Sequence, residues 1–154
     1  MGLKMKVIID DLWRIYDEIV AQSFSKAIVI PTNGTIRTDG ACVMGAGLAL
    51  DAKRRWPTLP FQLGEKLKIG GNVPHSFPQL RVITFPVKHN WWEKANLELI
   101  RQSAMYLATG SHASRYETIY LPKVGCGNGR LQWREVRSVL EEFLTKRFII
   151  VKCQ

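Results

Sequence analysis

The sequence predicts an α/β protein with three layers, in which helices cover both faces of a central sheet. Short apolar segments typical of buried strands alternate with longer segments whose apolar residues recur every three or four positions. Such alternation favours a sheet with helices packed on both sides. The 154 residues contain no repeat, low-complexity tract or long linker. We therefore expect one domain over residues 1–154.

The first part of the chain is expected to contain a strand, a helix and a second strand. Residues 5–10 predict a short strand. A helix is expected from Asp11, because four apolar residues have the i, i+3, i+4, i+7 spacing of one helix face, namely Leu12, Ile15, Tyr16 and Ile19. Residues 27–30 form a continuous apolar run that stops at Pro31, as expected for a buried strand.

The middle of the chain predicts a loop followed by helices. A polar loop is expected at residues 32–42. Residues 43–50 lead into a helix that should end before Pro57, because the residue before a proline disfavours the helical conformation. Residues 59–67 are expected to form a short helix, and residues 68–73 a turn between short strands.

Three strands and two helices are expected in the last part of the chain. The strands are predicted at residues 81–85, 118–121 and 148–151, and the prolines at positions 86 and 122 should end the first two. A helix over residues 93–107 has one apolar face, formed by Leu97, Ile100, Ala104 and Leu107. A strongly amphipathic helix is marked by Val136, Val139, Leu140, Phe143 and Leu144.

The composition favours an anionic partner. The net charge is +9, which favours nucleic acid, nucleotides or phosphorylated ligands. A basic surface that only maintains solubility is the alternative. No apolar run approaches the roughly 18–20 residues that cross a bilayer, and the first residues lack the apolar segment of a signal peptide. We therefore expect a cytoplasmic protein with no membrane contact.

The three cysteines indicate neither a metal site nor disulfide bonds. Cys42, Cys126 and Cys153 lie far apart and match no zinc spacing and no disulfide framework. We expect reduced thiols, no bound metal, no cofactor and a monomeric protein.

Two glycine-rich segments are the strongest functional signal in the sequence. The first, which opens a helix, consists of Val43, Met44, Gly45, Ala46 and Gly47. The second, which follows a strand, consists of Gly125, Cys126, Gly127, Asn128 and Gly129. Glycine lets the backbone approach a ligand closely, and amides at a helix start bind phosphate. Neither segment matches the P-loop or the full dinucleotide motif. Each alone is compatible with a tight structural turn, but together they predict a diphosphate held from two sides.

Three segments together resemble the macro domain family: residues 30–34 (IPTNG), 43–50 (VMGAGLAL) and 121–133 (LPKVGCGNGRLQW). The resemblance covers residues 10–151 and is closest to the branch of terminal ADP-ribose glycohydrolases and DNA ADP-ribosyl glycohydrolase antitoxins. It implies a mixed, roughly six-stranded sheet between helices, with ADP-ribose or an ADP-ribosylated macromolecule bound in a cleft across its top.

The resemblance also implies roles for individual residues. Asn33 should face the distal ribose, while both glycine segments wrap the diphosphate. Asp11 resembles the acid that accepts a hydrogen bond from the adenine amino group. From the residues alone, Asp11 can equally be the N-cap of the following helix, and Asn33, which precedes a glycine, can equally be a turn residue.

Lys88 and Asn33 are the candidate catalytic residues, with Asn33 holding the distal ribose in place. In the glycohydrolase branch a lysine after the strand that ends in Phe-Pro acts on the anomeric carbon of the distal ribose, and residues 85–88 (FPVK) match that context. A lysine nucleophile must be partly deprotonated; a solvated loop lysine is the alternative. The terminal glycohydrolase type has an aspartate at the position of Gly129, whereas the antitoxin type does without it. Trp91 and Trp92 either stack on a base or sugar or anchor the next helix.

Several functions remain open at this point. An ADP-ribosyl glycohydrolase that acts on DNA or protein fits the resemblance best. A non-catalytic ADP-ribose reader would keep both glycine segments, and an ADP-ribose 1″-phosphate phosphatase would use the same cleft without a lysine nucleophile. A nucleic-acid-binding module would explain the basic surface, but the glycine segments would then be only structural.

Overall fold

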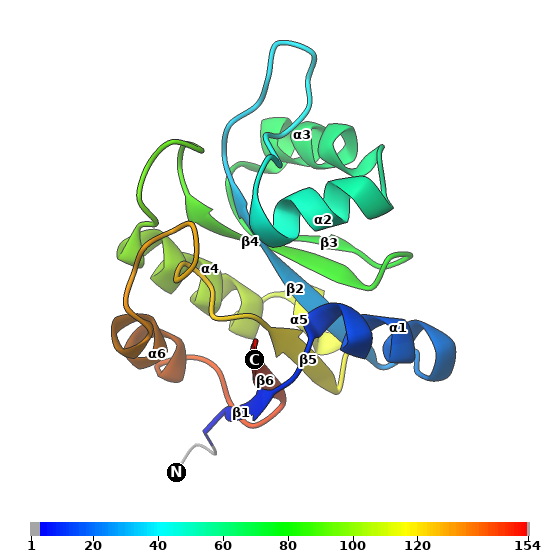
Figure 1. Cartoon of the computed structure of the whole chain (residues 1–154), viewed down its shortest axis with the longest axis vertical. Helices are drawn as coiled ribbons and strands as arrows, with labels where there is room; N and C mark the ends of the chain where they lie inside the picture. Colours follow the sequence, from blue (N-terminus) through cyan, green and yellow to red (C-terminus); the bar gives the residue numbers. More distant parts are fainter. Residues whose placement is uncertain (1–3, 154) are drawn as a thin grey trace.

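The computed structural model describes residues 4–153, which contain six strands and six helices (Figure 1). The strands are β1 (Lys6–Ile9), β2 (Lys26–Asn33), β3 (His75–Phe77), β4 (Val82–Lys88), β5 (Thr118–Leu121) and β6 (Phe148–Lys152). The helices are α1 (Leu12–Gln22), α2 (Gly47–Arg55), α3 (Leu59–Gly70), α4 (Leu97–Thr109), α5 (Ser111–Ser114) and α6 (Trp133–Glu141). The strands form one sheet in the order β1-β6-β5-β2-β4-β3, in which only β3 is antiparallel to its neighbour among these strands. The prediction of a mixed six-stranded sheet is confirmed.

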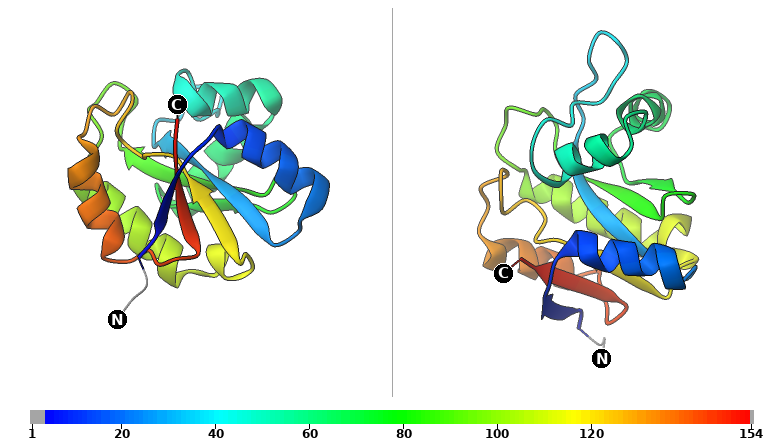
Figure 2. Two further views of the ribbon diagram at one scale, coloured as in Figure 1. Left: turned by 60° about the horizontal axis from the view of Figure 1, so that its bottom comes forward. Right: turned by 45° about the vertical axis from the view of Figure 1, so that its right-hand side comes forward.

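Helices cover both faces of this sheet, as predicted. Helices α1, α2 and α3 pack on one face, and α4, α5 and α6 pack on the other (Figures 1 and 2). In β2, Ala27 and Val29 belong to one hydrophobic cluster, while Ile28 and Ile30 belong to the other. All four side chains are fully buried. A strand buried on both faces is expected to be continuously apolar rather than alternating, which explains the apolar run seen in the sequence.

Two prolines that were expected to end strands lie inside them. Strand β2 continues through Pro31 to Asn33, and β4 continues through Pro86 to Lys88. β5 pairs only with the first residues of β2, and β3 only with the first residues of β4. Both prolines therefore lie where their strands are paired on one side, a position in which the missing N–H is tolerated. The sequence prediction was wrong here, and the correction places Lys88 in a strand instead of a loop.

Helix α3 is longer than predicted. It runs to Gly70, and Gly71, with φ of +85°, forms its C-cap. Residues 68–73 are therefore not a turn between two strands, because the helix occupies their first half and only β3 follows. Glycine adopts this positive φ without steric strain, which explains why the helix ends there.

The last three helices also differ from the prediction at their ends. Helix α4 begins after Asn96, whose side chain caps it by accepting a hydrogen bond from the Leu99 N–H (2.9 Å). The predicted start at residue 93 was too early because a turn occupies residues 90–93. Helix α6 ends at Glu141, so Phe143 and Leu144 lie beyond its end. Helix α5 was not predicted.

None of the helices within residues 4–153 combines the length and the apolar character needed to cross a membrane.

Candidate active site

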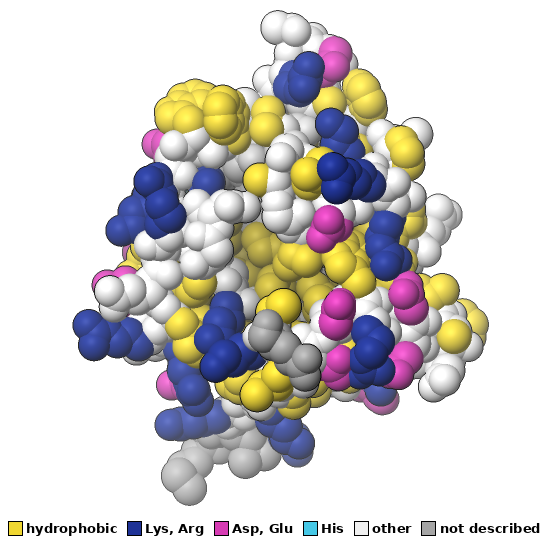
Figure 3. Space-filling view, viewed as in Figure 1, with side chains coloured by type: hydrophobic (Ala, Val, Ile, Leu, Met, Phe, Trp, Pro, Cys, Tyr) yellow, Lys and Arg dark blue, Asp and Glu magenta, His cyan; other side chains and the backbone are white. Residues whose placement is uncertain are grey.

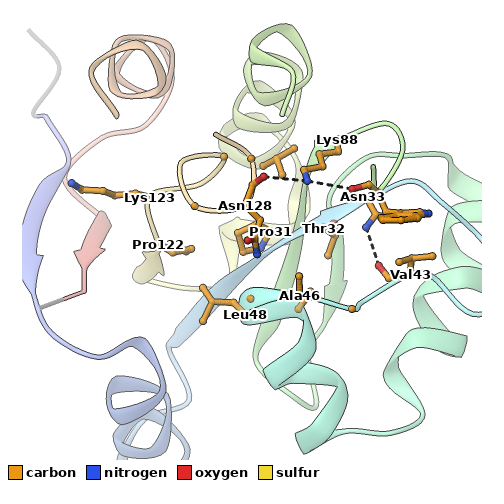
Figure 4. A pocket seen from close by; sticks show the side chains of 18 of the residues that line it. Pro31, Thr32, Asn33, Val43, Ala46, Leu48, Lys88, Pro122, Lys123 and Asn128 are labelled. Atoms are coloured by element: carbon orange, nitrogen blue, oxygen red, sulfur yellow. Dashed lines mark hydrogen bonds between the residues drawn. The ribbon is translucent and has the colours of Figure 1, made fainter. Parts of the chain in front are cut away.

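A cleft of about 750 Å³ lies at the carboxyl ends of β2, β4 and β5. Parallel strands place their carboxyl ends at one edge, where α/β proteins commonly bind ligands. The start of α2 forms one wall, and the loop between β5 and α6 forms the other. Figure 3 shows a hollow with a hydrophobic floor on this face, and Figure 4 shows the residues around it. Its volume is typical of a pocket for a nucleotide-sized molecule.

The first glycine segment borders the cleft where α2 begins. Val43, Gly45, Ala46 and Gly47 line it, and Ala46 is the N-cap of α2 but makes no side-chain capping hydrogen bond. The amides of this first turn are therefore not occupied by a side chain and can bind an anion, which the helix dipole favours. Met44 is only 2% exposed and its side chain packs in the core beneath the segment; its predicted place in the ligand-binding segment stays a prediction.

The second glycine segment faces the first across the cleft. Gly125, Gly127, Asn128 and Gly129 line the cleft. Two backbone hydrogen bonds fold the segment tightly, from Leu131 N to Gly125 O (2.9 Å) and from Arg130 N to Gly127 O (3.0 Å). A Cβ atom at Gly127 would meet nothing within 4 Å, so this position opens into free space. Cys126 does not line the cleft and instead packs against the core.

The Asn33 side chain is hydrogen-bonded to Val43, the first residue of the first glycine segment. Its Nδ2 donates a hydrogen bond to the Val43 carbonyl (2.9 Å), and its Oδ1 accepts one from the Thr35 N–H (3.0 Å). The Cys42 thiol donates to the Asn33 carbonyl (3.4 Å). Burial raises the pKa of Cys42 to about 12, which keeps this thiol protonated. Asn33 therefore forms the turn that the sequence allowed and also lines the cleft.

Lys88 is the last residue of β4 and lies opposite Asn33, the last residue of β2, in the strand register. Its Nζ donates hydrogen bonds to the carbonyls of Trp91 (3.3 Å) and Asn128 (3.4 Å), as Figure 4 shows. Burial, and then the positive charge of Arg130, lower the pKa of Lys88. The amine is therefore more readily deprotonated than that of a solvated lysine, as a nucleophile requires.

Asn72 fixes the backbone of Lys88 and was missed by the sequence analysis. The Lys88 carbonyl accepts hydrogen bonds from Asn72 Nδ2 (3.1 Å) and from the Gly34 N–H (3.2 Å). A Cβ atom at Gly34 would lie 2.7 Å from Asn72 Nδ2, so a larger residue at position 34 would displace the Asn72 side chain from the Lys88 carbonyl. Asn72 lies in the connection between α3 and β3, and no local pattern in the sequence points to a contact 16 residues away.

The charged residues lining the cleft are all basic. Arg37, Lys88 and Lys123 line it, and its lining contains no aspartate or glutamate. Such a lining favours an anionic ligand. Of these three residues, only Lys88 is predicted from the sequence, because Arg37 and Lys123 lie outside the glycine segments. Among residues 4–153, no three His, Cys, Asp or Glu side chains gather as metal ligands would.

Asp11 is the N-cap of α1. Its Oδ1 accepts hydrogen bonds from the N–H groups of Trp13 (2.8 Å) and Arg14 (3.2 Å). Asp11 is not among the residues that line the cleft. The capping interpretation of the sequence is thus confirmed, while a contact with adenine stays a prediction.

No protein-family model matches the chain, but individual proteins do. The chain is 31% identical over 121 residues to a DNA ADP-ribosyl glycohydrolase of Thermus aquaticus. The matched region covers 71% of this chain and 32% of that protein. It is 26% identical over 101 residues to the ADP-ribose glycohydrolase OARD1 of Bos taurus, with 66% of each covered. Among solved structures, the macrodomain of Thermus aquaticus DarG matches with a TM-score of 0.69 and 25% identity over 99% of both chains. The chain thus matches about a third of the length of the Thermus relative.

Proposed function

The chain belongs to the macro domain family, in the branch of the terminal ADP-ribose and DNA ADP-ribosyl glycohydrolases, and we propose that it binds ADP-ribose and removes it from a modified macromolecule. The observation that carries this proposal is the position of Lys88. Its amine lies at the carboxyl end of β4, next to Asn33 and to the second glycine segment, within one cleft.

Binding of ADP-ribose is supported by the two facing glycine segments. The diphosphate would lie between the start of α2 and residues 125–129, where backbone amides and a basic lining favour an anion. Asn33 would face the distal ribose, which places the anomeric carbon C1″ of that ribose toward Lys88. ADP-ribose should therefore bind much more tightly than AMP, which lacks the distal ribose and one phosphate.

The chemistry follows from the amine of Lys88. In its neutral form the amine donates its electron pair to C1″, and the bond between C1″ and the modified group breaks. The leaving group takes that bonding pair and a proton, and the nitrogen of Lys88 loses one proton. Hydrolysis of the resulting C1″–nitrogen bond releases ADP-ribose and restores the lysine. The lowered pKa of Lys88 supports this role because it increases the fraction of neutral amine.

The test compares Lys88→Ala with the wild type on ADP-ribosylated DNA and ADP-ribosylated protein. Turnover should be lost, while the affinity for free ADP-ribose should stay within a few-fold, because we expect the diphosphate and adenine to provide most of the contacts. Lys94→Ala is the matched control, since Lys94 is exposed in the loop that follows β4 and does not line the cleft. Full activity of Lys88→Ala would contradict the mechanism. No release by the wild type from any substrate would favour a reader, and release of phosphate from ADP-ribose 1″-phosphate alone would favour a phosphatase.

We propose DNA as the modified macromolecule. The net charge of +9 and the exposed side chains of Arg130 and Arg134, beside the second glycine segment, support this choice. Replacing both arginines with alanine should weaken binding of modified DNA more than binding of free ADP-ribose. It should also flatten the salt dependence of DNA binding, because fewer counterions are released. Equal loss for both ligands would count against a DNA contact.

A further inference from the structure

Two adjacent tryptophans on the loop between β4 and α4 are unusually exposed. Trp91 is 54% exposed and Trp92 is 61% exposed. The three other tryptophans are half-buried and packed against aromatic or basic side chains, namely Trp13, Trp56 and Trp133. The rings of Trp91 and Trp92 pack edge to face, nearly perpendicular and with centroids 5.9 Å apart. More than half of each side chain nevertheless remains exposed, so their contact with each other does not bury the pair.

The backbone that carries the two indoles is nevertheless held in place. The Trp91 N–H donates to Thr35 Oγ1 (3.1 Å), and the Trp91 carbonyl accepts from Lys88 Nζ (3.3 Å). Glu93 closes the turn, since its Oε1 accepts from the Asn90 N–H (2.7 Å) and its own N–H donates to the Asn90 carbonyl (3.1 Å). An aromatic pair on a fixed turn loses little conformational entropy when it binds a partner.

The pair lies at the mouth of the cleft, on the side of Lys88. Trp91 lines the cleft, whereas Trp92 does not. Figure 3 shows hydrophobic side chains gathered over this loop, with basic side chains nearby. With C1″ beside Lys88, as the proposed function has it, the group attached to C1″ would leave the cleft on the side of Trp91.

We propose that Trp91 and Trp92 stack on unpaired bases of a single-stranded nucleic acid that carries the ADP-ribosyl group. This inference rests on the proposed function and adds the surface that recognises the strand beyond the modified nucleotide. Proteins bind single strands by combining basic side chains, which contact the backbone, with exposed aromatic rings on which bases stack. Arg37 in the cleft and the exposed Arg130 supply the basic part. In a duplex the faces of the bases are covered by their neighbours and offer no such contact.

The decisive variant is Trp92→Ala, because Trp92 lies outside the ADP-ribose cleft. We expect it to weaken binding of an ADP-ribosylated single-stranded oligonucleotide by about tenfold, the effect typical of one lost base-stacking contact. Affinity for free ADP-ribose should stay at the wild-type value. Trp92→Phe should retain most of the affinity because it keeps a ring. Phe61→Ala is the matched control, since Phe61 is also exposed but lies on α3, away from this cleft.

Two further ligands separate the possible partners. The same oligonucleotide annealed to its complement should bind less tightly than the single strand and should not respond to Trp92→Ala. An ADP-ribosylated peptide should likewise not respond to that substitution. Wild-type affinity of Trp92→Ala for the single strand, or equal affinity of the wild type for strand and duplex, would overturn the inference and leave the cleft function intact. A wild type that binds no ADP-ribose would instead overturn the proposed function.

Discussion

The side chain of Asn128 reaches across the cleft to Gly47. Its Nδ2 lies 3.1 Å from the point that a Cβ atom at Gly47 would occupy. The two glycine segments thus approach each other closely at this point, although about 80 residues separate them in the chain. Gly47 has a φ of +56°, a conformation that other L-residues adopt only with strain. Because Gly47 has no side chain, its backbone can adopt this positive φ, and the two glycine segments can approach each other closely.

Replacing Gly47 with alanine should weaken both the fold and the ligand site. The left-handed conformation should lower the free energy of unfolding by about 1 kcal/mol, measured by urea unfolding. The new methyl group should also displace Asn128, and calorimetry should show weaker ADP-ribose binding. In the double variant Gly47→Ala, Asn128→Ala the affinity should partly recover while the loss of stability remains. Unchanged ADP-ribose affinity in Gly47→Ala would show that the close contact between Gly47 and Asn128 does not matter for binding.

A carboxylate at Gly127 or Gly45 should abolish ADP-ribose binding without unfolding the protein. A Cβ atom at either position would meet nothing within 4 Å, so the new side chain fits. It would carry a negative charge into the space proposed for the diphosphate. Thermal unfolding should remain close to that of the wild type, whereas calorimetry should detect no binding. Gly127→Gln, similar in size but uncharged, should retain more affinity than Gly127→Glu; equal loss would assign the effect to size alone.

Removing the charge of Arg130 should shift the pH–rate profile of turnover to higher pH. The positive charge of Arg130 contributes to the lowered pKa of Lys88. In Arg130→Gln that pKa should rise, so less neutral amine is present at a given pH, and the ascending part of the pH–rate profile should move to higher pH. The measurement is turnover of a saturating ADP-ribosylated nucleotide. Arg134→Gln is the control, because Arg134 is not among the groups that shift Lys88; an identical shift there would remove Arg130 from the explanation.

An aspartate at position 129 should not improve this protein, although the resemblance to the terminal glycohydrolase type implies an acid there. A Cβ atom at Gly129 would lie 2.5 Å from the Gly125 carbonyl oxygen and 2.7 Å from the Ala95 Cβ. Such overpacking typically lowers the free energy of unfolding by roughly 1–3 kcal/mol. We expect Gly129→Asp and Gly129→Ala to be similarly destabilised in urea unfolding and to gain no turnover. Wild-type stability of Gly129→Asp would show that the segment can adjust and that an acid is tolerated.

The sequence was informative where the chemistry is local. The positions of the glycine segments follow from residues that allow a close approach of the backbone, and both segments line the cleft. Strand β5 has the predicted bounds because Pro122 follows it directly. Pro31 and Pro86, by contrast, were misjudged because their effect depends on whether a neighbouring strand pairs on both sides, and the sequence does not show which strands are neighbours.

Residues that act through distant contacts were not predictable. Asn72 contacts the carbonyl of Lys88, 16 residues further along the chain, and this contact depends on how the connection between α3 and β3 meets the end of β4. Nothing in the sequence distinguishes Arg37 and Lys123 from the other lysines and arginines, of which the chain has 22 in all. Their place in the cleft follows from the strands beside which their loops lie, which only the folded structure shows.

The arrangement of the sheet has a consequence for how the protein assembles. β1, the earliest strand in the chain, pairs with β6, the latest of the six described, and Lys6 lies opposite Ile149. Closing this pair brings together residues separated by nearly the whole chain, which is entropically unfavourable until the intervening elements are ordered. We therefore expect β1 to dock after β2, β4 and β5 have paired. During synthesis, β1 emerges before the other described strands of this sheet, and it cannot pair with β6 until residues 148–152 have been translated.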